Sequence, residues 1–175
     1  MDPLRLHDYL VAARTRLFDW IRPLDGQQYA AEHPIGLGSL ARTLHHVKAA
    51  EWMYMERIRG RTGPIDAPGV ENDPEVSAAD AMPFDALEAA WRAQSEQVHA
   101  DLASVSEWDA RRVYTTMWEG RPYAYRASAS DIFSQLALHE VHHRAQVLHM
   151  LRRTGVATDE IDFNALMWEP VNASD

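Results

Sequence analysis

The sequence predicts an all-α protein, a four-helix bundle with a short β-hairpin between the third and fourth helices. Apolar residues recur at steps of three and four over four long segments, which is typical of amphipathic helices. Residues that interrupt helices, mainly Pro and Gly, separate these segments. One stretch before the last segment is instead rich in β-branched and aromatic residues, which favour strands. The 175 residues suit a single domain, 1–175, with a sizeable core.

The first two helices have clear ends in the sequence. We expect the first over 3–22, before Pro23, because its apolar residues repeat at helical spacing: Leu6, Leu10, Ala13, Leu17 and Ile21. We expect the second over 39–59, with Ser39 as N-cap and Gly60 closing it. The following segment, 61–74, is dense in Pro, Gly and Asp, and we interpret it as a loop long enough to cover something.

The second half of the chain contains two more helices and the hairpin. Pro83 is well placed at the start of a helix over 84–104, where Phe84, Leu87, Trp91, Ser95, Val98 and Leu102 repeat at helical spacing. Strand-forming residues on either side of Glu119-Gly120 predict the hairpin. The last long helix is expected over 131–153, with Ser128 or Ser130 as its N-cap. An apolar tail, FNALMW, should pack across the bundle end.

Composition excludes several classes of function. Acidic residues outnumber basic ones by 26 to 17, and the net charge of −9 would repel nucleic acid and anionic lipid, so we expect neither as a partner. The absence of Cys excludes disulfides, thiolate zinc sites and iron–sulfur ligation. The first residues do not resemble a secretory leader, and no segment approaches about 18 uninterrupted apolar residues. We therefore expect a cytoplasmic protein.

Histidines are concentrated in the last long helix. His139, His142, His143 and His149 lie within eleven positions there. On a helical wheel, His139 and His143 share a sector of about 80° with the apolar residues expected in the core. These apolar residues are Ile132, Leu136, Val147 and Met150. We therefore expect His139 and His143 to point inward, and His142 and His149 to lie on a flank or in solvent.

Two inward histidines four residues apart can reach one metal ion. The second helix offers a third imidazole from the His45-His46 pair, and three ligands would leave a coordination position open, as in catalytic sites. Periodicity does not choose between His45 and His46, because the apolar stripe of that helix runs between them. The alternative is that these histidines are hydrogen-bonded core residues with no ion.

Two segments resemble the helix signatures of the DinB/YfiT-like superfamily of bacterial metal-binding proteins. They are SLARTLHHVKAAEW and HEVHHRAQVLHMLRRTG, and the resemblance covers about 3–155. The first alignment selects His46, and the second places His139 and His143 on the family's two histidines. One departure is Ala145, where the family commonly has Gly.

The resemblance implies a fold and several activities. The bundle would be up-down-down-up and often homodimeric, and the three histidines would bind a divalent metal, zinc or nickel first, with iron or manganese as alternatives. Relatives include thiol S-transferases that use a low-molecular-weight thiol, an isomerase and hydrolases acting on small molecules. A metal serves all of these by activating a thiol or water. Two alternatives are a non-catalytic metal or small-molecule binding protein of the stress response and a metal-free interaction module.

Further residues are candidates for the surroundings of the site. Glu51, Glu140 and Gln146 are the nearest acceptors for the second ring nitrogen of a ligand histidine. Glu51 could also be a general base, or a partly exposed charge paired with Arg42 or Lys48. Arg144 could hold an anionic substrate group or form a salt bridge. The aromatic side chains of Trp52, Tyr54, Trp91 and Trp118 could line a pocket, although such spacing is usual for core residues.

Overall fold

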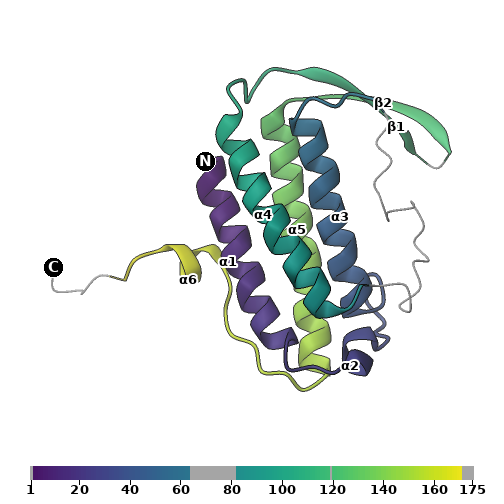
Figure 1. Cartoon of the computed structure of the whole chain (residues 1–175), viewed down its shortest axis with the longest axis vertical. Coiled ribbons are helices and arrows are strands. Elements are labelled where there is room, and N and C mark those ends of the chain that lie inside the picture. The colour runs from purple at the N-terminus through teal and green to yellow at the C-terminus, as the bar shows by residue number, and fades with distance from the viewer. Residues whose placement is uncertain (1, 64–81, 119, 171–175) are drawn as a thin grey trace.

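The structure is a computed structural model that describes residues 2–63, 82–118 and 120–170. Four long helices and one antiparallel hairpin dominate it (Figure 1), with two short helices added. In chain order the elements are α1 (Pro3–Ile21), α2 (Gly26–Ala30), α3 (Leu40–Ile58), α4 (Phe84–Ser104), β1 (Arg112–Trp118), β2 (Arg121–Ala127), α5 (Ala129–Arg153) and α6 (Phe163–Met167). The predicted all-α class with a hairpin before the last long helix is confirmed.

The helix ends lie close to those predicted. Pro83 precedes α4, which spans the expected residues, and the Ser39 side chain accepts a hydrogen bond from the Arg42 N–H at the start of α3. Helix α5 begins two residues earlier than expected. Ser128, not Ser130, is its N-cap, and it forms a reciprocal capping box with Asp131 that satisfies two backbone N–H groups.

The four long helices lie side by side, with α1 and α5 running opposite to α3 and α4 (Figure 1). Helix α3 packs most extensively against α5, and α1 contacts both α4 and α5. The apolar stripes meet in one core, whose fully buried side chains include Leu10, Leu40, Met55, Leu87, Trp91, Val98, Val147, Met150 and Leu151. The close pairing of α3 with α5 brings histidine-bearing faces together.

The hairpin is anchored to the end of α3. Tyr114 is opposite Tyr125 in the register, and the two rings stack with centroids 5.5 Å apart. Tyr114 is buried, and Arg57 from α3 lies over its ring and donates a hydrogen bond to the Thr115 carbonyl oxygen. The predicted loop over 61–74 lies outside the described residues from position 64 onward.

The C-terminal tail packs on α1. The Tyr9 hydroxyl donates a hydrogen bond to the Ile161 carbonyl oxygen, and the Tyr9 ring meets the Phe163 ring edge to face at 5.1 Å. The apolar tail therefore packs on the side of α1 through α6, and the expectation that it lies across the bundle end is wrong. Within the described part of the chain, none of the helices combines the length and apolar character needed to span a membrane.

Candidate metal centre

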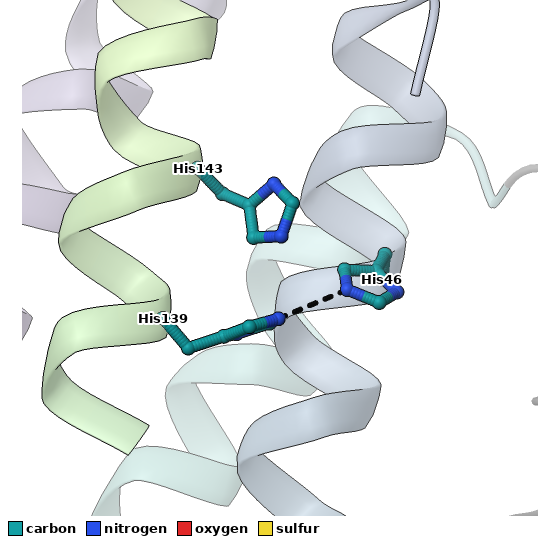
Figure 2. Close-up of side chains that lie close together, drawn as sticks. All are labelled: His46, His139 and His143. Carbon is teal, nitrogen blue, oxygen red and sulfur yellow. Dashed lines mark hydrogen bonds between the residues drawn. The ribbon is translucent and has the colours of Figure 1, made fainter. Parts of the chain in front are cut away.

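Three histidines from two helices converge at the α3–α5 contact (Figure 2). His46 comes from α3, and His139 and His143 come from successive turns of α5. One ring nitrogen of each lies within 4.8 Å of the other two, and the Nε2 atoms of His46 and His139 are 3.0 Å apart. His143 is buried, His139 is half-buried and His46 is exposed, so the cluster has an inner wall and an open side.

The structure selects among the histidines that the sequence offered. His46 rather than its neighbour His45 joins His139 and His143. His142 and His149 are exposed, as predicted. His142 nevertheless takes part in the surroundings of the site, because its Nε2 atom lies 2.9 Å from the Gln146 side-chain nitrogen.

The three imidazoles are neutral at neutral pH. Burial, reinforced by repulsion from neighbouring histidines, lowers the pKa of His139 to about 3 and that of His46 to about 4, although part of His46 reaches solvent. Burial also lowers the pKa of His143. A neutral imidazole keeps a lone pair on one nitrogen, which is the form that binds a metal.

The geometry fits a small divalent ion. Zinc–nitrogen bonds of about 2.0–2.1 Å at a tetrahedral angle would separate two ligand nitrogens by about 3.3 Å. The 3.0 Å separation between His46 and His139 is close to that value, and the separations of up to 4.8 Å within the group would have to shorten for all three nitrogens to bind one ion. The Nδ1 atom of His143 is 2.9 Å from the Gln146 carboxamide oxygen, which leaves its Nε2 atom available. Three neutral nitrogen donors with an open side match an incomplete coordination shell.

Three side chains were proposed as hydrogen-bond acceptors for the ligand histidines. Gln146 contacts His143, whereas Glu51 and Glu140 lie in a buried network around Arg14. The Arg14 guanidinium donates to Glu51 at 2.6 Å and to Glu140 at 2.7 Å. Trp91 and Gln94 also donate to Glu51. The expected pairing of Glu51 with Arg42 or Lys48 is therefore wrong, since its carboxylate is buried with Arg14.

This network joins the four long helices. Arg14 from α1 contacts Glu51 from α3, Ser95 from α4 and Glu140 from α5. Burial alone would lower the pKa of Arg14, but the two carboxylates outweigh it and raise that pKa. Arg14 was not among the residues predicted from the sequence, although its position four residues after Leu10, on the apolar face of the first helix, was a signal of burial.

Arg144 contacts Tyr9, whereas the sequence suggested an anionic substrate group or a salt bridge. It is buried, its Nη2 group donates to the Tyr9 hydroxyl at 2.6 Å, and its guanidinium lies over the Tyr9 ring. Among the described residues it forms no salt bridge. These contacts place Arg144 at the α1–α5 contact.

The aromatic residues considered as pocket-lining candidates lie in different places, one in the core and one beside the histidine cluster. Trp91 is a core residue that donates to Glu51, whereas the Tyr54 ring meets the His139 ring edge to face at 6.0 Å. Trp52 is half-buried, and the side chain of Trp118 lies outside the described part. Of the four aromatics, Tyr54 thus contacts a histidine of the cluster.

The sequence model of the DinB family matches residues 2–172. The chain belongs to the DinB family. A search of curated proteins finds no match. In this DinB protein the two segments that carried the resemblance lie on α3 and α5, and their three histidines are those that converge. Ala145, the departure from the family pattern, is exposed on α5 and outside the cluster.

Proposed function

We propose that this DinB protein binds one divalent metal ion through His46, His139 and His143, within a single up-down-down-up four-helix bundle. The observation that carries the proposal is the convergence of three neutral imidazoles from two helices. Imidazole ligands suit zinc and nickel, and also iron. The antiparallel pairing of α3 and α5 supports the bundle arrangement.

The residues around the ion have distinct tasks. His143 anchors the inner side, where Gln146 occupies its Nδ1 atom, and His46 forms the exposed side through which a small molecule would enter. The Tyr54 ring packs edge to face on the His139 ring. A bound divalent ion would lower the pKa of a thiol or water in the open position and could polarise a carbonyl group.

The activity we propose is metal-dependent thiol S-transfer or hydrolysis of a small-molecule substrate. Support comes from the open side of the cluster and from the family. The alternative is a non-catalytic metal or small-molecule binding protein. One observation favours this alternative: Glu51, the carboxylate considered as a general base, is committed to Arg14, Trp91 and Gln94.

We also propose a homodimer. Exposed apolar side chains on α5 support it, since Leu138 and Val141 are 67% and 42% exposed on one side of the helix. Light scattering on the purified protein should give twice the chain mass, and Leu138→Lys should shift it toward the monomer. A monomeric wild-type protein at micromolar concentration would contradict this part of the proposal.

Elemental analysis tests the metal site. After reconstitution with zinc or nickel and removal of free metal, the wild-type protein should retain one ion per chain, and His143→Ala should retain much less than one. His149→Ala is the matched control, because His149 is an exposed histidine of the same helix outside the cluster. Equal metal content in the wild type and His143→Ala would exclude the proposed site.

A cobalt-substituted sample separates the two functions. If the ion activates a thiol, a low-molecular-weight thiol should change the visible spectrum of the bound cobalt, and an added electrophile should be consumed faster than without protein. An unchanged spectrum together with no turnover of thiol or ester substrates would favour the non-catalytic alternative.

A further inference from the structure

The loop between α2 and α3 contacts α5 beside the histidine cluster. The loop closes on itself through backbone hydrogen bonds from His33 N–H to Gly38 and from Gly38 N–H to Ile35. At its tip, Gly36 has a φ of 55°. A Cβ atom on Gly36 would lie 2.2 Å from the Gln146 carboxamide oxygen and 2.6 Å from its carbon. The backbone of Gly36 therefore packs directly on the Gln146 side chain.

Gln146 connects two histidines of α5. Its carboxamide oxygen lies 2.9 Å from His143 Nδ1, and its nitrogen lies 2.9 Å from His142 Nε2. A carboxamide oxygen only accepts hydrogen bonds and the NH2 group only donates them. His143 must therefore carry its proton on Nδ1, and His142 must present an unprotonated Nε2 atom.

The orientation of this carboxamide determines whether His143 can bind a metal. With the oxygen toward His143, the proton is on Nδ1 and the lone pair is on Nε2. With the amide reversed, the NH2 group would face Nδ1, the proton would move to Nε2, and Nε2 could not be a ligand. In the orientation that the structure shows, the amide nitrogen faces His142 Nε2, so this orientation requires His142 to carry its own proton on Nδ1.

We propose that Gly36, Gln146 and His142 form a clamp that holds His143 in its Nδ1–H form, with Nε2 free toward the cluster. All three are positioning residues that act through His143, and the consequence for metal affinity rests on the proposed function. Only Gly at position 36 leaves room for the carboxamide, since any Cβ atom would displace the oxygen that accepts from His143.

The clamp and a purely structural role of Gly36 predict different results for Gly36→Ala. The atoms that an added Cβ would meet belong to the flexible end of Gln146, so the protein can relieve the contact by moving that side chain. Gly36→Ala should then change the tautomer of His143 and the metal affinity while losing no more thermal stability than Gly38→Ala, since both substitutions place Ala at a positive φ. Gly38→Ala is the matched control, because Gly38 also has a positive φ, 87°, but a Cβ there would meet nothing closer than 3.5 Å.

The tautomer is measured first, on the metal-free protein. Two-bond proton–nitrogen NMR correlations of the His143 ring should show the Nδ1–H form in the wild type and in Gly38→Ala. Gln146→Met, which removes the acceptor, and Gly36→Ala should show a mixture or the Nε2–H form. Gln146→Glu should keep the Nδ1–H form of the wild type, because a carboxylate also accepts a hydrogen bond from Nδ1. An unchanged His143 tautomer in both Gln146→Met and Gly36→Ala would overturn the clamp.

Zinc affinity, measured by competition with a chelator, tests the consequence. Loss of such supporting contacts typically weakens metal binding by about 10–100-fold, and we expect this loss for Gly36→Ala, Gln146→Met and, to a smaller extent, His142→Phe. In a Gln146→Ala background, adding Gly36→Ala should change affinity by no more than about twofold, because the clashing atoms are gone. Additive losses in this double variant would contradict the coupling of Gly36 to Gln146.

The two measurements separate the proposals. If the wild type shows the Nδ1–H form and both Gly36→Ala and Gln146→Met change it, the clamp is supported even when no zinc binds, and only the proposed function fails. If Gln146→Met and Gly36→Ala both keep the Nδ1–H form of His143 and the wild-type zinc affinity, the proposed function stands and the clamp is wrong.

Discussion

The Nε2 atoms of His46 and His139 lie 3.0 Å apart, although 93 positions separate the two residues and they belong to different helices. The packing of α3 on α5 creates this proximity. It also makes a testable distinction, because His45 and His46 are neighbours in sequence and only one of them joins the cluster.

Replacing His46 with Ala should lower zinc affinity strongly, while His45→Ala should leave it close to the wild-type value. The reason is that His46 supplies one of three nitrogen donors, whereas His45 lies outside the group. Chelator competition measures both variants, and the ratio of their dissociation constants should exceed about tenfold. Equal losses would mean that the ligand from α3 is wrongly assigned.

Replacing Arg14 with Met should destabilise the protein by about 3–5 kcal/mol, because two buried carboxylates lose their partner. Adding Glu51→Gln and Glu140→Gln should recover much of this loss by removing the uncompensated charges. Urea unfolding measures the free energies. Arg92→Met, which breaks an exposed pair with Glu88, is the control and should cost less than about 1 kcal/mol. Failure of the triple variant to recover stability would argue against a charge effect.

Protonation of His7 should destabilise the protein in acid. His7 is 2% exposed, and neither ring nitrogen has a hydrogen-bond partner within the described ranges. Burial lowers its pKa from 6.5 to about 4. The unfolded state therefore binds the proton more tightly, so stability falls as pH drops from 6.5 to 4 and this contribution is constant above 6.5. The loss is up to about 3 kcal/mol.

Urea unfolding at several pH values checks the His7 effect. The difference in unfolding free energy between His7→Phe and the wild type should change across pH 4–6.5, in favour of the variant at low pH. His149→Gln, which removes an exposed histidine, is the control variant. A constant difference between His7→Phe and the wild type would show that His7 does not titrate in this range.

Ser128→Ala should cost about 1 kcal/mol, because it removes the side-chain oxygen that accepts from the Asp131 N–H at the start of α5. Ser130→Ala should change stability by no more than about 0.5 kcal/mol, since the Ser130 hydroxyl makes an exposed hydrogen bond to Asp109. Thermal unfolding of the two variants compares them directly. A larger loss for Ser130→Ala would move the N-cap to the later serine.

Local sequence patterns predicted the helices and part of the site. The apolar period placed the four long helices within two residues at each end, because it reports which face each helix buries. The four-residue step between His139 and His143 put both on the inner face of α5 for the same reason. The sequence did not choose between Ser128 and Ser130, since both serines precede the same apolar run. The backbone conformation at the start of α5 identifies Ser128 as the N-cap.

Helical periodicity predicted two inward-pointing histidines on the last helix, and family motifs added His46. The packing of the helices then brought His46 to these two histidines, paired Glu51 with Arg14 rather than with Arg42 or Lys48, and placed Gly36 on Gln146. Periodicity within a helix fixes the face on which a side chain lies. It does not specify which residue of a distant element will lie opposite, because that depends on how the helices pack.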